Sequence, residues 1–132
     1  MPVERGVIRN RKYAQQIRDF GGLRFGKITP TDIDAAVEFG DRLYVFVEAK
    51  HGDAPIPYGQ RLLLERLCDA LHQPPRRYAV VILASHNTDA DIDFGALPVR
   101  MARWCGRWHV RNGITVRAAI DKTLEFVKAL PS

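Results

Sequence analysis

The sequence predicts an α/β fold in which helices pack around a mixed β-sheet. Residues 32–39 and 43–50 are two strand-like runs separated by a short turn signal, which indicates a hairpin. Residues 58–72 carry apolar side chains at helical spacing, and residues 77–84 form a near-continuous apolar run typical of a strand covered on both faces. A helix that joins two such strands implies a crossover and a parallel pair beside the hairpin.

The length and composition favour a single domain over residues 1–132. A chain of 132 residues with 46% hydrophobic content is long enough for one compact core and too short for two. The first predicted element is a helix over residues 10–20, which Asn10 caps and in which Tyr13, Ile17 and Phe20 share one face. Two glycines end that helix.

The hairpin register depends on the length of its loop. If residues 40–42 (Gly-Asp-Arg) form a three-residue loop, Phe39 lies opposite Leu43. Counting back places Asp34 opposite Glu48, on the same face of the sheet. A two-residue loop would put these two acids on opposite faces, so the parity of the loop decides whether they meet. In the favoured register their Cβ atoms are about 5 Å apart, which lets two carboxylates share a divalent cation.

The remaining elements follow in order along the chain. Residues 51–57 form a loop, the helix over 58–72 stops at Gln73-Pro74-Pro75, and the buried strand comes next. Residues 85–98 are expected to be irregular, and residues 108–110 a short edge strand. Thr115 is expected to cap a last helix over 116–130. The two cysteines, Cys68 and Cys105, are expected to be buried and unpaired.

Charge divides unevenly along the chain. Residues 1–27 carry seven basic and two acidic side chains, residues 28–75 carry four and eight, and residues 76–132 carry nine and five. An acidic centre between basic segments suits a carboxylate site on a surface that attracts phosphate, although chance clustering of solvated charges gives the same pattern. No apolar run approaches the roughly 20 residues of a membrane span, so we expect no membrane partner and a cytoplasmic location.

These motifs together resemble the PD-(D/E)XK nuclease superfamily. Within it, they are most similar to small phage-type nucleases and to the restriction- or resolvase-like branches. The matching segments are Pro30-Thr31-Asp32-Ile33-Asp34, Val47-Glu48-Ala49-Lys50 and the helix that Gln60 opens. The resemblance covers residues 10–84. It implies a three-layer sandwich around a mixed sheet, with a restriction-endonuclease-like α-β-β-β-α-β core. The pattern Pro-Thr-Asp-Ile-Asp leaves two candidate acids, of which Asp34 is favoured by the register and Asp32 is the reserve.

The resemblance also implies a chemistry. Asp34, Glu48 and the carbonyl of Ala49 would hold Mg²⁺ or Mn²⁺, cations that favour oxygen ligands. Lys50 would orient the attacking water or stabilise developing charge, and Gln60 would position water or substrate. The implied activity is hydrolysis of phosphodiester bonds in nucleic acid, with DNA as the expected substrate of an endonuclease. The alternative for the acids is a surface ion pair with Lys50, and for Gln60 a solvent-facing position.

Further residues are candidates for nucleic-acid contacts. Arg61 and Tyr58 flank Gln60, and His51 follows the motif directly. Trp104 and Trp108 lie among arginines and invite base stacking, but packing is the favoured role. A homodimer would suit cleavage of two strands. Two other functions stay open: a nucleic-acid-binding module that keeps the nuclease fold without cutting, and a protein-interaction module.

Overall fold

The computed structural model describes residues 7–8, 10–16 and 18–131. The chain divides into two compact units, residues 1–31 and residues 32–132.

The first unit contains little regular structure. Its described elements are the short helix α1 (Arg11–Ala14), the 3-10 turn η1 (Gly21–Leu23) and one isolated bridge between Phe25 and Ile28. The predicted helix over residues 10–20 is therefore wrong beyond its first turn, while Ile17 lies outside the described residues. Short helices are marginal in water unless a tertiary surface covers their apolar face, and Phe25 and Ile28 in this unit are about 70% exposed.

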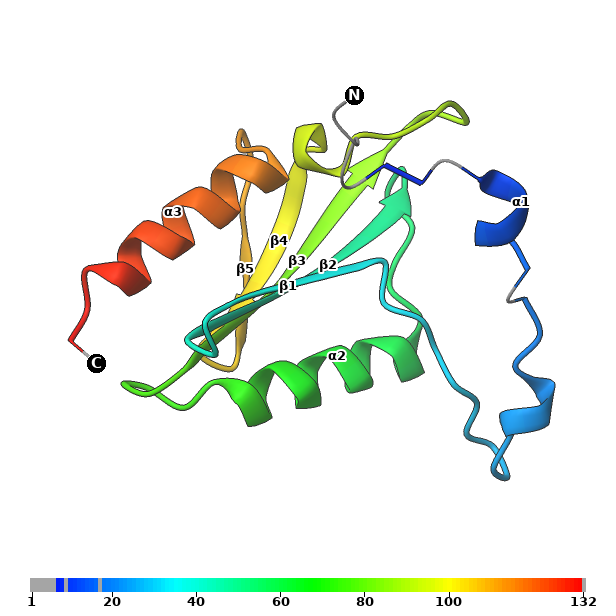
Figure 1. Cartoon of the computed structure of the whole chain (residues 1–132), viewed down its shortest axis with the longest axis horizontal. Coiled ribbons are helices and arrows are strands. Elements are labelled where there is room, and N and C mark those ends of the chain that lie inside the picture. Colours follow the sequence, from blue (N-terminus) through cyan, green and yellow to red (C-terminus); the bar gives the residue numbers. More distant parts are fainter. Residues whose placement is uncertain (1–6, 9, 17, 132) are drawn as a thin grey trace. The chain divides into compact units, whose positions relative to one another are not determined.

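The second unit is an α/β fold with a five-stranded mixed sheet (Figure 1). The strands lie in sequence order, and only β2 and β3 are parallel neighbours. Their parallel pairing confirms the predicted crossover through α2. The elements are β1 (Ala35–Phe39), β2 (Leu43–His51), α2 (Tyr58–Leu71), β3 (Tyr78–His86), η2 (Phe94–Ala96), β4 (Val99–Trp104), β5 (Arg107–Val110) and α3 (Val116–Lys128).

The hairpin has the predicted register. Phe39 pairs with Leu43, and the pairing continues without a shift to Ala35 opposite Val47. The turn is closed by a hydrogen bond from the Arg42 amide to the Phe39 carbonyl, 2.9 Å long. Gly40 and Asp41 both have positive φ, as primed hairpin turns require, and Arg42 completes the three-residue loop. The first strand begins later than predicted, at Ala35.

One helix packs on each face of the sheet (Figure 1). On one face, Leu64 and Cys68 of α2 are fully buried against Phe46, Ala79 and Val81. The other face carries the larger cluster, which includes the two α3 residues Val116 and Val127 with alternate residues of β2 and β3. The central strands are thus covered on both sides, which explains why residues 78–84 are continuously apolar.

The second half of the sheet departs from the prediction. The strand β4 falls in a region for which no element was predicted, and it pairs with β3 on one side and β5 on the other. Two arginines and a register shift near its start disrupt the alternation that would have marked it as a strand. Two strands, rather than the three of the expected core, precede α2 among the described residues.

The last helix was predicted correctly in position and cap. Thr115 accepts a hydrogen bond from the Ala118 amide, and α3 ends at Lys128, two residues before the predicted end. Cys68 is buried as predicted, but Cys105 is exposed because it lies in the tight β4–β5 turn. Among the described residues, no helix combines the length and the apolar character needed to cross a lipid bilayer.

Candidate functional site

The two predicted acids meet at the start of the hairpin. Glu48 lies on β2, and Asp34 immediately precedes β1, so the observed register continues to place the two residues opposite each other. An Asp34 carboxylate oxygen accepts a hydrogen bond of 2.9 Å from the Ala49 amide. This bond replaces a strand-to-strand bond at the point where β1 pairing ends, and it fixes the Asp34 carboxylate beside β2.

Lys50 and Gln60 extend the cluster on the same sheet face. The Lys50 ammonium lies 3.2 Å from a Glu48 oxygen and donates a hydrogen bond of 3.0 Å to the side-chain oxygen of Gln60. The Gln60 amide nitrogen in turn donates to the main-chain carbonyl of Asp32, at 3.1 Å. Gln60 is 7% exposed, so its predicted alternative as a solvent-facing residue is wrong. The first turn of α2 is tied through these bonds to both sides of the hairpin.

The structure separates the two candidate acids by what each contributes. Asp34 supplies its carboxylate to the cluster, whereas the contact recorded for Asp32 is made by its backbone carbonyl. The register therefore agrees with Asp34 as the favoured acid, whereas Asp32 lies before the paired part of the hairpin.

The carboxylate of Glu48 occupies an unusual electrostatic environment. Its side chain is 2% exposed, and its second oxygen, Oε2, is buried without a hydrogen-bond partner in the described part of the chain. Burial raises the pKa of Glu48, the neighbouring Asp34 carboxylate raises it further, and Lys50 partly opposes both effects. A buried carboxylate beside a second carboxylate is costly unless positive charge compensates it. Lys50 compensates only one of the two acids.

The donor set fits a hard divalent cation. Glu48 has an unsatisfied carboxylate oxygen and neighbours the Asp34 carboxylate, and both groups are oxygen ligands. The amide and carbonyl of one strand residue point to the same side, so the Ala49 carbonyl faces the edge where its amide meets Asp34. Among the described residues, no group of three or more His, Cys, Asp or Glu side chains is placed to hold a metal ion. Two carboxylates and a carbonyl suit Mg²⁺, which binds few protein ligands and keeps several waters.

The predicted nucleic-acid contacts fall in two places. Tyr58 and Arg61 lie on the first turn of α2 with Gln60, and both are exposed. The Arg61 guanidinium lies over the Tyr58 ring, 5.7 Å from its centre, and 3.8 Å from Glu65. His51 lies away from these residues, because strand alternation puts it on the face of the sheet that α3 covers. There the centre of its ring is 5.3 Å from the centre of the His86 ring.

The tryptophans take part in packing, as favoured from the sequence. The Trp108 indole donates to Glu65, whose carboxylate also lies 3.7 Å from Arg103. Arg103 makes a bidentate pair with Asp69. Trp104 stacks on Tyr78 with ring centres 5.8 Å apart. The contacts of Glu65 and Asp69 join α2 to β4 and β5, and the Trp104–Tyr78 stack joins β4 to β3 on the α3 face.

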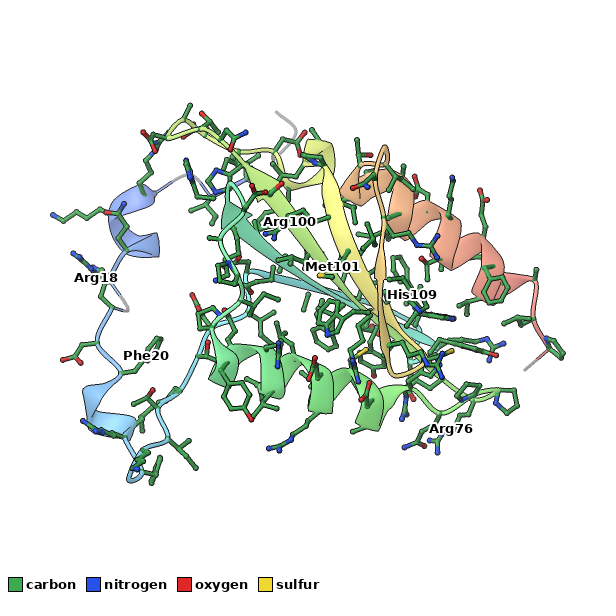
Figure 2. The ribbon with its side chains drawn as sticks, turned by 180° about the vertical axis from the view of Figure 1, so that it is seen from behind. Arg18, Phe20, Arg76, Arg100, Met101 and His109 are labelled. Atoms are coloured by element: carbon green, nitrogen blue, oxygen red, sulfur yellow. The ribbon has the colours of Figure 1, made fainter. Side chains whose placement is uncertain are left out.

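Two residues near the site escaped sequence reasoning. Ser85 pairs with Lys50 across β2 and β3 and is half-buried on the same sheet face. Arg100 is skipped in the β3–β4 register, and its guanidinium donates a 2.9 Å hydrogen bond to the carbonyl of Ala54, in the loop that joins Lys50 to Gln60. Figure 2 shows Arg100 at the end of the sheet where β2 and β3 terminate. Neither residue carries a sequence signal, because both depend on pairings that the missed strand β4 and the crossover create.

A cavity of about 350 Å³ lies on the other face, between the sheet and α3. It contains none of the predicted site residues. Its lining is mainly apolar, from Ile82, Trp104 and Phe126, with Arg111 and Lys122 among the few polar residues.

Comparisons of the chain with protein-family models, curated proteins and solved structures find no match. The functional argument therefore depends on the geometry of the acid cluster itself.

Proposed function

We propose that this chain is a metal-dependent nuclease that hydrolyses phosphodiester bonds in DNA and belongs with the PD-(D/E)XK nucleases. The observation that carries the proposal is the buried Glu48 carboxylate, which has an unsatisfied oxygen, beside the Asp34 carboxylate and 3.2 Å from the Lys50 ammonium. The segment β1-β2-α2-β3 supplies the strand, strand, helix and strand on which the resemblance rests. Two strands instead of three before α2 make this a reduced version of the expected core.

In this proposal, Asp34, Glu48 and the Ala49 carbonyl hold Mg²⁺ or Mn²⁺. The bound cation would supply positive charge to the phosphate and lower the pKa of a water molecule. Asp34 is held in place by the Ala49 amide, and Glu48 is held by burial and by Lys50. These restraints fix both carboxylates before substrate arrives, which removes the cost of ordering them during the reaction.

Lys50 is the residue that faces both the acids and the solvent. Its side chain is 22% exposed, so the ammonium can reach a phosphate while it remains bonded to Gln60. A positive charge at that point stabilises the negative charge that develops on phosphate oxygens in the transition state. Gln60 acts as a positioning residue, because it accepts from Lys50 and anchors itself on the Asp32 carbonyl. Exposed Arg61 and Tyr58 on the same turn would contact the nucleic-acid backbone.

Cleavage assays test the proposal directly. Purified protein is incubated with labelled single-stranded, duplex and four-way-junction DNA in Mg²⁺ or Mn²⁺, beside the variants Glu48→Ala and Lys50→Ala. We expect metal-dependent cleavage that both substitutions reduce by at least about 100-fold, the scale of losing one electrostatic contact to a transition state. Circular dichroism on each variant verifies that the fold is retained.

The two alternative functions predict different results in the same assay. A module that binds but does not cut would give salt-sensitive DNA binding with no metal-dependent turnover. A protein-interaction module would give neither binding nor cleavage at low salt. Cleavage that persists in Glu48→Ala would contradict the assigned site.

A further inference from the structure

The outer edge of β1 is one edge of the five-stranded sheet. β1 is a terminal strand of the sheet, so its outward backbone groups have no strand partner among the described residues. Natural proteins guard such edges with charges, prolines or bulges. β1 has no proline, its register is regular, and Val37 at its centre is 41% exposed. Its only charged residue, Glu38, accepts a 2.8 Å hydrogen bond from the Asp41 amide in its own turn.

The opposite edge of the sheet differs in this respect. β5 begins with exposed Arg107 and is followed directly by exposed Arg111, so a second copy of this edge would meet like charges. The contrast between the two edges identifies β1 as the side available for strand pairing.

The sequence of β1 is complementary to itself. In an antiparallel pair centred on Val37, Ala35 lies opposite Phe39 of the second copy, and Ala36 lies opposite Glu38 of the second copy. Each pair sets a small side chain against a large one, and no like charges are directly opposed. An apolar groove of about 370 Å³ runs beside this edge, from Ala36 and Glu38 to Leu67 and Leu71 on α2. The groove gives room for the aliphatic stem of the incoming Glu38.

We propose that two copies of this chain pair through β1, antiparallel about Val37, and so join their sheets into one. A strand of five residues forms a small interface, so we expect a reversible dimer rather than an obligate one. The two-fold axis is perpendicular to the sheet, which keeps the α2 faces of both copies on the same side.

One consequence rests on the proposed function, whereas the pairing itself does not. Asp34 lies three residues before Val37 in each copy, so the two acid clusters lie about 20 Å apart along the strand direction. Both clusters face the same way and can therefore reach the two strands of one DNA duplex. The dimer then cuts both strands, and a monomer nicks one.

Sedimentation equilibrium of the full chain tests the pairing without metal or nucleic acid. The samples span about 1 to about 100 μM and include Val37→Lys, Val37→Glu and, as the control on the other edge, Val110→Lys. Val110 is 69% exposed on β5, so its substitution adds the same charge to an exposed position on the other edge strand. We expect wild type and Val110→Lys to dimerise, and each Val37 variant to be monomeric because like charges meet at the axis.

An equimolar mixture of the two Val37 variants gives the sharpest result. Opposite charges then face each other at the centre of the pair, so we expect the mixture to recover the dimer. The proposal is overturned if wild type stays monomeric over the whole concentration range or if the mixture stays monomeric. It is also overturned if Val110→Lys is monomeric while the Val37 variants still dimerise. Because neither measurement involves cleavage, failure here leaves the proposed nuclease activity standing.

Discussion

At the residue scale, the proposed function depends on the cluster around Glu48, and the sequence predicted part of that cluster. The meeting of Asp34 and Glu48 was predictable, because a three-residue loop and strand alternation fix which side chains are opposed. The roles of Gln60 and Asp32 were only half predictable. Gln60 was expected near the site, but its anchor is a backbone carbonyl, and no side-chain pattern reports where a carbonyl points.

Replacing Gln60 with Ala tests its positioning role. The substitution removes the acceptor that holds Lys50 and the bond to the Asp32 carbonyl. We expect kcat for DNA cleavage to fall about 10- to 100-fold, the usual scale for a residue that orients a catalytic or metal-binding group. Arg66→Ala, an exposed position on the same helix, is the control. Equal activity of Gln60→Ala and wild type, with Lys50→Ala inactive, would show that Lys50 needs no such support.

His72 makes the stability of the fold sensitive to pH. Its Nδ1 accepts a 3.0 Å hydrogen bond from the Ala79 amide, so protonation of Nδ1 would break that bond. Burial holds the pKa of His72 below its usual value of 6.5, with the Asp69 carboxylate partly opposing. Below pH 6.5 the unfolded chain therefore binds more protons than the folded one. Stability is complete above that pH and falls as the pH drops towards the lowered pKa.

Thermal unfolding of His72→Asn tests this pH dependence. The Asn side-chain oxygen replaces Nδ1 as an acceptor but does not titrate. The Tm of the variant should therefore change less between pH 7.5 and pH 5.5 than the Tm of wild type. At pH 7.5 the two proteins should have similar Tm values. A wild-type Tm that is constant across that interval would count against the role of His72.

At the element scale, periodicity predicted the parts of the fold that a core enforces. The helix α2 and the strand β3 were recognisable because each buries a continuous apolar stripe or face. The helix predicted over residues 10–20 has similar spacing, yet of its described residues only Arg11–Ala14 are helical. Spacing alone does not stabilise a helix when the packing surface is missing. The strand β4 was not predicted, because its sequence does not alternate clearly between apolar and polar residues. Pairing with β3 and β5 nevertheless makes it a strand.

Two neighbouring leucines on α2 test how the helix is held to the sheet. Leu64 is fully buried, whereas Leu63 is 42% exposed. We expect Leu64→Ala to lower the free energy of unfolding by about 2 to 5 kcal/mol, through lost burial and the cavity left behind. Leu63→Ala should cost well under half as much. Chemical denaturation of both variants gives the comparison, and equal losses would mean that α2 is not packed as described.

At the scale of the whole molecule, the sheet unit contains every residue assigned to the site. Both buried clusters are formed within residues 32–132, and so are Asp34, Glu48, Lys50 and Gln60. The acidic residues concentrate in the middle of the sequence, and the fold gathers two of them at one end of the hairpin. The distribution of charge could be read from the sequence, but the buried, unsatisfied oxygen of Glu48 could not, because burial depends on both layers around the sheet.

The most direct test of the central claim compares the two candidate acids in one cleavage assay. Asp34→Asn and Asp32→Asn make the same chemical change two residues apart, so differences between them report position alone. With duplex DNA and Mg²⁺, we predict that wild type and Asp32→Asn cut at similar rates and that Asp34→Asn loses at least about 100-fold. Absence of cleavage by wild type with every DNA substrate, or full activity in a folded Asp34→Asn variant, would contradict the assignment of Asp34 and Glu48 as a metal-dependent nuclease site.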